Sequence, residues 1–339
     1  SKNLPATLAL LEEKLLNPAF APQDFHRVQQ QTLQGLQNAE KNAGFLAQQA
    51  YRKLMFGNHI MGYNGQGTLA TVSKLTPADL QAYYQQYFKP AGGQLIVVSD
   101  AAQPEVQTLL SKTLQQWQGK APALTVAQPM PVAKADTIYL VDKPDAPQSE
   151  IRIGKRSITE DITGEFYRAG LMNFVLGGNF NSRINLNLRE DKGYTYGAFS
   201  GFSADKVAGV YTAQAAVRAD ATAASLTEFL KEIDRYQQQG ITDEELNFMR
   251  QAINQADALK YETPNAKLGF MAQILEHNLS PDFVKERNQI VASISKEEIN
   301  ALAKKHLNSK EMAIVVVGDA KKLRPELQAL GFTVEDYKI

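Results

Sequence analysis

Two side chains stand out as candidates for chemistry: Arg189 and Tyr196, seven positions apart in LGGNFNSRINLNLREDKGYTYGAF, Leu176–Phe199. A guanidinium and a phenol are strong hydrogen-bond donors of fixed shape, and together they could bind a carbonyl or stabilise an oxyanion. The spacing alone also permits a structural interpretation. Arg189 would then pair with a neighbouring acid, Glu190 or Asp191, and Tyr196 would fill a half-buried strand position.

The sequence offers no candidate for a metal site or a nucleophile. None of its histidines stands in H-x-x-E-H, H-x-x-x-H or another spacing that places two imidazoles on one helical face, and each is expected on the surface or in a loop: His26, His59, His277 and His306. Cysteine is absent and no G-x-S-x-G elbow occurs, so thiolates, disulfides and that type of serine nucleophile are excluded. We therefore expect no metal ligand and no catalytic residue in this chain.

Two further patterns favour structural roles. VLGGNFNSR, Val175–Arg183, is rich in glycine but follows a helix instead of a strand, so it fits neither a dinucleotide fingerprint nor a Walker loop. Its glycines, Gly177 and Gly178, are expected to form a helix C-cap and a sharp turn. Core packing is expected for the aromatic residues at helical spacing, Tyr83, Tyr84, Tyr87 and Phe88.

The composition indicates a globular protein without an electrostatic preference for polyanions. The 339 residues favour two domains, and 44% hydrophobic residues with 21% charged residues can form substantial cores. Because 36 basic residues balance 36 acidic ones, neither nucleic acid nor an anionic membrane is expected as a partner. The sequence contains no run of eighteen apolar residues, so it predicts no membrane-spanning helix. The start at Ser-Lys instead of Met favours a processed chain or a fragment.

A long internal repeat organises the chain. LTPADLQAYYQQYFKPAGGQLIVVSDA, Leu75–Ala101, aligns without a gap with ISKEEINALAKKHLNSKEMAIVVVGDA, Ile294–Ala320, at a constant offset of 219 residues (294 − 75). Each copy begins with a helix N-cap and an acidic residue three positions later, the pattern of a capping box: Thr76 with Asp79, and Ser295 with Glu298. Each then continues as an amphipathic helix and a buried β-branched strand, IVVSD or VVVGD. The repeat predicts two homologous units.

The first unit is expected to lack its front half. The offset places residue 1 opposite Asp220, so the part of the second unit from about Ala135 to Ala219 has no counterpart in the first. The proline-rich stretch Gln118–Asp136 has little helical periodicity, which is typical of an interdomain linker. We therefore predict the end of a first domain at 1–120, a linker at 121–134 and a second domain at 135–339.

Strands grouped early and helices grouped late in the second domain predict an α+β fold, with helices on one face of a mainly antiparallel sheet. The expected strands are TIYLVDK, SEIRIGKR, and about Tyr194–Ala204 and Val210–Val217, besides the repeat strand. The expected helices are Gly164–Leu176, Arg183–Asp191, Ala221–Gln239, Asp243–Tyr261, Asn265–His277 and Pro281–Val291.

The segment around Arg189 resembles the signature of the M16 (pitrilysin/insulinase-like) metallopeptidases, S-R-L-x-x-x-L-R-x-x-x-G-L-x-Y. The residues that match it in order are Ser182, Arg183, Leu188, Arg189, Gly193 and Tyr196. The resemblance extends along the chain, because NPAFAPQDFHRVQQQTL, FGNHIMGYNGQG and LTPADLQAYYQQYFKPAGGQLIVVSD are similar to the later part of the family's first domain.

This resemblance implies two homologous domains of the LuxS/metallohydrolase-like type that enclose a chamber. In the family, the first domain carries H-x-x-E-H on a helix and a more distant Glu as the third zinc ligand, while the second contributes an Arg and a Tyr that hold substrate. Arg189 and Tyr196 are by this resemblance the substrate-binding pair. The zinc helix would fall in an N-terminal portion that this sequence does not contain.

The position of the third zinc ligand departs from the family pattern. The Glu is expected near Leu33–Leu36, where the sequence reads LQGL with Gln34 and Gly35, and no carboxylate stands between Asp24 and Glu40. A neutral amide or a glycine cannot replace a carboxylate ligand of zinc. The resemblance therefore points to the bacterial arrangement in which one subunit carries zinc and its partner supplies Arg and Tyr.

The sequence analysis favours a zinc-free, substrate-binding subunit of a heterodimeric M16-type peptidase. Its expected partners are a zinc-bearing homologue and a peptide or unfolded protein, its own cofactor is none, and family resemblance favours the periplasm over the cytoplasm. One alternative is a fragment of an active zinc endopeptidase whose H-x-x-E-H portion and Glu lie elsewhere. Another is a scaffold without a role in proteolysis.

Overall fold

The protein is described here by a computed structural model that covers residues 3–123, 130–134, 136–257 and 262–339. Its contacts divide the chain into two compact units, each built from separated segments. The first unit comprises Ser1–Gln37, Gln66–Val126 and Ala258–Pro281, and the second comprises Asn38–Gly65, Ala127–Asp257 and Asp282–Ile339.

These compact units interleave along the sequence, unlike the division drawn from the repeat. Residues 38–65 pack with the second unit, although they precede the end of the first repeat copy. The division into 1–120, 121–134 and 135–339 concerns repeated sequence and stays a prediction in that sense. Residues 124–129 of the expected linker, and residue 135, lie outside the described residues.

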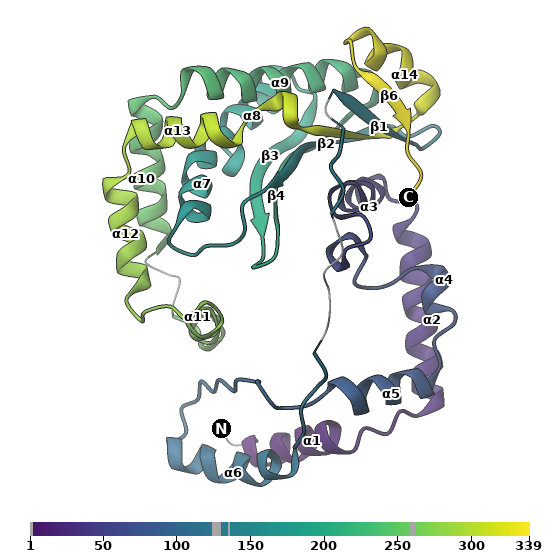
Figure 1. The fold of residues 1–339 in the computed structure, drawn as a ribbon, viewed down its shortest axis with the longest axis vertical. Helices are drawn as coiled ribbons and strands as arrows, with labels where there is room; N and C mark the ends of the chain where they lie inside the picture. The colour runs from purple at the N-terminus through teal and green to yellow at the C-terminus, as the bar shows by residue number, and fades with distance from the viewer. Residues whose placement is uncertain (1–2, 124–129, 135, 258–261) are drawn as a thin grey trace. The chain divides into compact units, whose positions relative to one another are not determined.

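A six-stranded mixed sheet forms the centre of the second unit (Figure 1). Its strands follow the order β3-β4-β2-β5-β1-β6, with β1 at Thr137–Asp142, β2 at Gln148–Ser157, β3 at Thr195–Ala204, β4 at Gly209–Arg218, β5 at Ala313–Gly318 and β6 at Thr333–Asp336. The neighbours β3/β4, β4/β2 and β2/β5 are antiparallel, whereas β5/β1 and β1/β6 are parallel. The predicted α+β class with a mainly antiparallel sheet is confirmed.

One face of this sheet carries most of the helices. Ile138 and Leu140 of β1, and Ile314 and Val316 of β5, point into the larger hydrophobic core, because alternate residues of a strand face the same side. The helices of the second unit outside residues 38–65 are α7 (Glu165–Asn173), α8 (Arg183–Asn185), α9 (Thr222–Gln239), α10 (Asp243–Asp257), α12 (Phe283–Ser293), α13 (Lys296–His306) and α14 (Ala320–Ala329). The predicted end of α10 at 258–261 lies outside the described residues.

The opposite face is covered in part by helix α3 (Ala43–Phe56), which the sequence interpretation did not place there. Tyr51 of α3 lies in a smaller core with Val315 of β5 and donates a hydrogen bond of 2.7 Å to the carbonyl oxygen of Tyr211. Gly154 of β2 makes this approach possible: a Cβ there would lie 2.3 Å from Tyr51 Oη and 1.9 Å from the Tyr211 carbonyl. The α3 segment is therefore an integral layer of the second unit.

The first unit is helical in its described residues. It contains α1 (Leu4–Leu16), most of α2 (Pro22–Ala39), α4 (Leu69–Val72), α5 (Pro77–Tyr87), α6 (Gln103–Gln116) and α11 (Pro264–His277). Helix α1 packs against α6, where Thr113 Oγ1 donates to Glu12 Oε2 at 2.5 Å. Gln29 of α2 donates to the carbonyl oxygens of Val72 and Leu75 at 2.9 and 3.1 Å.

The strand predicted at IVVSD, Ile96–Asp100, is wrong. This segment has no regular secondary structure, and Leu95 and Val97 are exposed. A strand needs a neighbour for its N–H and C=O groups, and the described residues of the first unit provide none.

The core packing predicted for the aromatic residues of α5 is also wrong. Helix α5 buries no residue completely, and Tyr83 and Phe88 are exposed. Their rings contact one another and nearby loops instead: Tyr83 lies 5.0 Å from Tyr87, and Phe88 lies 5.6 Å from Trp117, between ring centroids.

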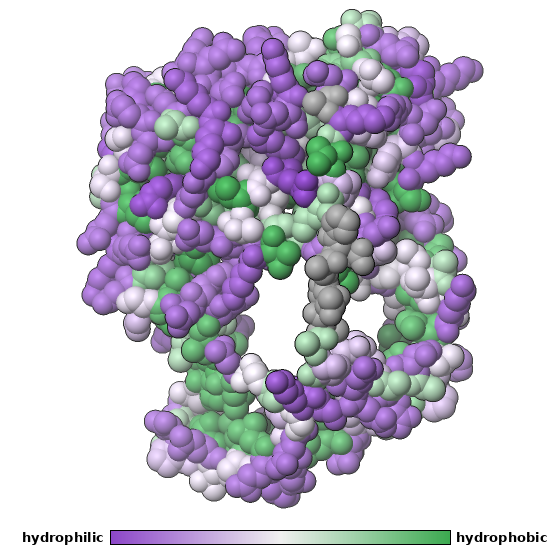
Figure 2. All heavy atoms as spheres, in the orientation of Figure 1, coloured by the Kyte–Doolittle hydropathy of each residue, from purple (hydrophilic) through white to green (hydrophobic). Residues whose placement is uncertain are grey.

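The helices of the second unit present a polar outer surface. Figure 2 shows mostly hydrophilic side chains where these helices lie, consistent with helix α9, whose buried side includes Leu226, Phe229 and Ile233. The described residues also contain three short 3₁₀ turns, at Ile60–Gly62, Ala219–Ala221 and Ser309–Glu311. Among the described residues, no helix combines the length and apolar character needed to cross a membrane.

Candidate functional site

Arg189 and Tyr196 lie on a connection between helix α7 and strand β3 that includes two π-helical segments. The chain passes through the π-helical residues Phe174–Gly178, the turn before α8, a second π-helical segment at Leu186–Asp191 and then β3. π-Helical turns are rare and occur often at functional sites, because the extra residue per turn redirects side chains. The predicted helix at Arg183–Asp191 is present, but its last six residues, Leu186–Asp191, are π-helical.

Gly177 holds the first π-helical segment close to β3. A Cβ on Gly177 would lie 2.1 Å from Ser200 Oγ, so only glycine permits the contact. Ser200 donates to Asn173 Oδ1 at 2.6 Å, and Asn173 Nδ2 returns a bond of 2.7 Å to the Ser200 carbonyl. The two glycines do end the helix, as predicted, yet Gly177 is required for close approach to the strand instead of a left-handed C-cap.

Asparagine side chains fix the turn that follows. Asn179 Nδ2 donates to the Phe174 carbonyl at 2.6 Å, and Asn185 Nδ2 donates to the Phe180 carbonyl at 2.7 Å. The same Asn185 accepts from the backbone N–H of Ala198 at 3.0 Å through its Oδ1. Asn185 is fully buried, and its side chain makes hydrogen bonds both to the turn and to β3, so it holds the two segments together.

Arg183 of the signature has a structural role. Its Nε and Nη2 each donate to Glu245 of α10 at 2.6 Å, and Nη2 also reaches the Gly240 carbonyl at 3.0 Å. Its guanidinium lies 4.8 Å from the ring centroid of Tyr236. Burial alone would raise the pKa of Glu245, but the bonds from Arg183 and Thr242 outweigh it and the pKa is lowered. This bidentate pair joins the connection to the outer helices.

Arg189 belongs to the second π-helical segment and is partly free to act on a ligand. Its guanidinium lies 4.3 Å from the ring centroid of Phe180, and Nη1 lies 3.3 Å from Glu190 Oε1. The ion pair with Glu190 is the contact that the structural interpretation of the sequence predicted for Arg189. The Nη1 atom is nevertheless buried and makes no hydrogen bond to the described residues. Donor capacity therefore remains on this side chain.

A β-bulge turns Tyr196 outward. Strand β3 shifts register against β4 between Thr195 and Ala198, and Thr195 Oγ1 stabilises the bulge by donating to the Ala216 carbonyl at 2.6 Å and accepting from Gly197 N–H at 3.1 Å. Tyr196 is 91% exposed, so the half-buried strand position of the structural interpretation does not describe it. Bulges of this kind redirect side chains beside binding sites.

The backbone between the two residues is closed by hydrogen bonds. Gly193 adopts a left-handed conformation with φ of 63°, its N–H donates to the Arg189 carbonyl at 3.2 Å, and Tyr194 N–H donates to the Leu188 carbonyl at 2.9 Å. Arg189 and Tyr196 share no hydrogen bond or ion pair in the described structure. They flank a short ordered turn as two separate donors, and their joint role in binding stays a prediction.

Two histidines are more buried than the sequence suggested. His59 is buried in a turn, where its Nδ1 accepts from Met61 N–H at 3.3 Å. His306 is also buried, on the last turn of α13, with its Nε2 2.7 Å from Glu165 Oε1. His59 therefore lies in a turn, as expected, although it is buried, whereas the expectation of a surface or loop position is wrong for His306. Each has a structural contact that accounts for it.

The residues present do not fit a zinc ion. Among the described residues, no three His, Cys, Asp or Glu side chains are grouped so that they could hold a metal. At the expected position of the third ligand, helix α2 carries Gln34 and Gly35. A catalytic zinc site needs three protein ligands, so none can be assigned to this part of the chain.

Comparison with known proteins identifies the family. A family model described as the peptidase M16 inactive domain matches residues 74–253, more than half of the chain. The chain belongs to the peptidase M16 family. The resemblance found in the sequence is thus confirmed, and the match is to the inactive-domain type of the family.

Curated M16 relatives carry names that differ on catalysis. The chain is 23% identical over 315 residues to the non-peptidase homolog YmxG of Helicobacter pylori, covering 92% of this chain and 72% of that one. It is 25% identical over 270 residues to the uncharacterized zinc protease YmxG of Bacillus subtilis, covering 78% of this chain but 63% of that one. The chain therefore spans only about two thirds of the length of such relatives.

Solved M16 structures share the fold. A peptidase M16 inactive domain from Pseudomonas fluorescens superposes with a TM-score of 0.81 at 24% identity, covering 92% of this chain and 74% of that one. The periplasmic protease PqqL from Escherichia coli superposes with a TM-score of 0.72 at 17% identity, covering 100% of this chain and 40% of that one. At these identities the likeness establishes the fold.

The sequence indicated Arg189 and Tyr196, but it did not indicate most of the contacts that hold these two residues in place. The pairing of Arg183 with Glu245 joins residues 62 positions apart, and nothing in their spacing indicates it. The bulge at Tyr196 had a weak signal in Gly197, because glycine inside a strand often marks a bulge.

Proposed function

We propose that this chain is the zinc-free, non-catalytic subunit of a heterodimeric M16-type peptidase, and that Arg189 and Tyr196 hold peptide substrate near a zinc ion carried by the partner chain. The observation that carries the proposal is the presence of two available donors beside one ordered turn: the exposed Tyr196 phenol at the β-bulge, and the half-buried Arg189 guanidinium, whose Nη1 makes no hydrogen bond to the described residues. The absence of a metal-binding group from the described residues supports a non-catalytic role.

The two side chains would act as donors to the peptide. The Tyr196 hydroxyl and the Arg189 guanidinium would each donate to a backbone carbonyl of an extended peptide, which itself pairs with a sheet edge of the catalytic partner. Phe180 and Glu190 would hold the guanidinium against the turn until peptide binds. Hydrolysis would belong to the partner, since this chain supplies no metal ligand in its described part.

A structural neighbour supports the proposed compartment. The periplasm is proposed because a structural neighbour is named as a periplasmic protease. The partner is proposed to be a zinc-bearing M16 homologue, and the substrate a peptide or unfolded protein.

A reconstituted cleavage assay tests the proposal. The chain is co-expressed with a zinc-bearing M16 homologue encoded nearby, and kcat/KM is measured on an amidated peptide without acidic residues. We expect Arg189→Ala and Tyr196→Phe each to lower kcat/KM by about tenfold or more, because each removes a donor to the reacting peptide. The matched controls Arg218→Ala, which removes another surface arginine paired with a nearby acid, and Tyr83→Phe should leave it unchanged.

Two outcomes would overturn the proposal. Unchanged cleavage with both Arg189→Ala and Tyr196→Phe would favour a scaffold. A zinc content near one per chain in the natural full-length protein, with cleavage in the absence of a partner, would favour an active endopeptidase, as the name of the Bacillus subtilis relative suggests for that protein.

A further inference from the structure

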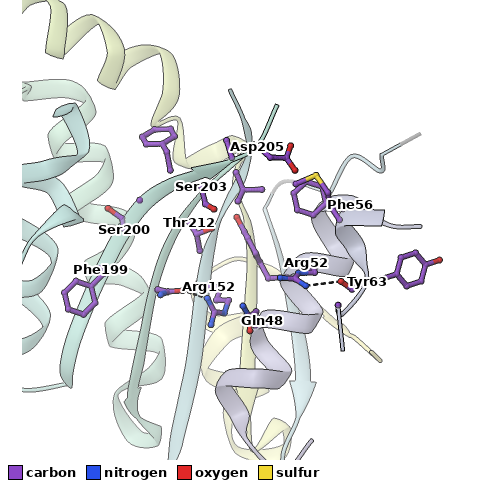
Figure 3. A pocket seen from close by; sticks show the side chains of 18 of the residues that line it. Gln48, Arg52, Phe56, Tyr63, Arg152, Phe199, Ser200, Ser203, Asp205 and Thr212 are labelled. Atoms are coloured by element: carbon purple, nitrogen blue, oxygen red, sulfur yellow. Dashed lines mark hydrogen bonds between the residues drawn. The ribbon is translucent and has the colours of Figure 1, made fainter. Parts of the chain in front are cut away.

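A second candidate binding site, with hydrogen-bond donors that lack partners among the described residues, lies on the sheet face that carries α3. It is a pocket of about 720 Å³, and its walls come from α3, the turn after α3 and strands β2, β3 and β4 (Figure 3). This volume lies in the range of small-ligand pockets. All of its lining residues belong to the second unit, so its shape is defined within one compact body.

One end of the pocket is basic. Arg52 and Gln48 of α3 approach Arg152 of β2 in Figure 3, and all three line the pocket. Arg52 Nη1 donates to the Tyr63 carbonyl at 2.9 Å. Arg152 Nη1 donates to Gln214 Oε1, and its Nε is buried without a hydrogen-bond partner among the described residues. Two guanidinium groups thus meet here with most of their donors unused.

The nearby carboxylates do not neutralise this end. Asp205 lies toward the other end of the pocket in Figure 3, and it accepts from the backbone N–H groups of Val207 and Ala208 at 2.7 and 3.0 Å. Glu150 lies two residues along β2 on the face of Arg152. Burial nevertheless lowers the pKa of Arg152, outweighing the opposite effect of Glu150 and Tyr51. The guanidinium is therefore incompletely compensated, and an anion would stabilise it.

Apolar side chains also line the pocket, and in Figure 3 Phe199 and Tyr63 lie on opposite sides of the two arginines. Phe199 of β3 and Ile60 and Tyr63 of the turn after α3 expose large fractions of their side chains and line the pocket with Met61. Phe199 follows directly after the β-bulge, which lies between Thr195 and Ala198. The pocket thus combines two guanidinium groups with an aromatic side chain, Phe199, on the strand that also presents Tyr196.

We propose that this pocket is a subsite that binds a peptide carboxylate, from an acidic side chain or a C-terminus, next to an apolar residue. Arg152 and Arg52 would donate charge-assisted hydrogen bonds to the carboxylate, Gln48 and Gln214 would complete its shell, and Phe199 would pack against the neighbouring side chain. The inference rests on the proposed function only for the ligand being a peptide.

Isothermal titration calorimetry on the full 339-residue chain, without a partner, tests the subsite. Three peptides of equal length share one acetylated sequence with a central Phe: one has Glu after Phe and an amidated end, one has Gln and a free C-terminal carboxylate, and one has Gln and an amidated end. We expect at least one carboxylate peptide to bind about tenfold tighter than the neutral one at low salt, because hydrogen bonds to charged groups are the stronger class. The tighter of the two identifies the source of the carboxylate.

Matched arginine variants decide whether this pocket causes the preference for a carboxylate peptide. Arg152→Gln and Arg52→Gln should each reduce the preference to near unity, while Arg156→Gln should preserve it. Arg156 lies on the same strand and face as Arg152 but does not line this pocket. Circular dichroism checks that each variant is folded. If Arg152→Gln unfolds the chain, the peptide preference of Arg52→Gln still tests the pocket.

The proposal is overturned if the wild-type chain shows no preference for either carboxylate peptide, or if the preference survives in the folded arginine variants. The cleavage test of Arg189 and Tyr196 uses a peptide without a carboxylate. Failure of the subsite and failure of the proposed function are therefore separate results.

Discussion

The two copies of the repeat, Leu75–Ala101 and Ile294–Ala320, begin alike and end differently. Both start with a capping box and an eleven-residue helix, α5 in the first copy and α13 in the second. In the second copy the chain then forms β5, a fully buried strand between β1 and β2. In the first copy the equivalent residues form no strand, and the helix buries no residue completely.

This difference separates local from non-local determinants of structure. A capping box and a helical period act within a few residues, so similar sequences give similar helices in both copies. A strand depends on hydrogen bonds to neighbours that are distant in sequence. β5 has β1 and β2 beside it, whereas the described residues of the first unit supply no strand for IVVSD.

The largest predicted contrast is between equivalent valines of the two copies. Val316 in β5 is completely buried, and its counterpart Val97 is exposed. We expect Val316→Asp to lower the free energy of unfolding by more than about 4 kcal/mol, because it buries an unpaired charge. Val97→Asp should change it by less than about 0.5 kcal/mol. Denaturant unfolding followed by circular dichroism measures both.

The matched pair also tests the structure of the first copy. If Val97→Asp destabilises the chain as much as Val316→Asp does, residues 95–98 are buried in solution, and the contrast between the copies is lost.

A smaller and more equal effect is expected at the two helix caps. Thr76 Oγ1 accepts from Asp79 N–H at 3.3 Å and Ser295 Oγ accepts from Glu298 N–H at 3.1 Å. Thr76→Ala and Ser295→Ala should each destabilise their own helix by about 1 kcal/mol, since each leaves helix N–H groups without a partner. Amide hydrogen exchange of the first turns of α5 and α13 measures the two losses separately. A loss confined to one copy would show that the cap is not a local determinant.

These contrasts indicate how much of the fold the sequence could predict. The strands β1 to β5 and the helices α7, α9, α12 and α13 follow from hydrophobic periodicity and caps within each segment. The packing of α3 on the far side of the sheet could not be predicted, because it depends on Tyr51 reaching Tyr211, 160 residues away. The absence of a strand at IVVSD depends likewise on missing neighbours.

The candidate site shows the same limit. The family signature indicates Arg189 and Tyr196, but their surroundings depend on distant contacts. Arg183 and Arg189 both belong to the family signature, yet the Arg183 guanidinium is held in a bidentate pair with Glu245. The pocket around Arg152 has no sequence motif, because its lining residues come from α3, the turn after it and strands β2, β3 and β4, which are distant from α3 in the sequence.

The smallest predicted effect is a pH dependence present in one copy only. His306 ends α13, and the equivalent residue of α5 is Tyr87. Burial lowers the pKa of His306 below its ordinary value of 6.5, with Lys305 and Lys155 acting in the same direction and Glu165 opposing. The unfolded chain therefore takes up a proton before the folded one does. The stability contribution is complete above pH 6.5 and declines as the pH falls below it.

We expect the free energy of unfolding to decrease between pH 7 and pH 5 in the wild-type chain, and to decrease less in His306→Gln. His26→Gln, which removes an exposed histidine of α2, is the matched control substitution. Denaturant unfolding at a series of pH values gives the slopes. The hydrogen bond to Lys305 chiefly lowers the pKa of Glu165, so the stability contribution of Glu165 is present above its ordinary pKa of 4.5 and is lost only as the pH falls below that value, outside the range from pH 7 to pH 5. Equal slopes in wild type and His306→Gln would mean that the imidazole titrates alike in the folded and unfolded states, and the predicted pH dependence of the second copy would be lost.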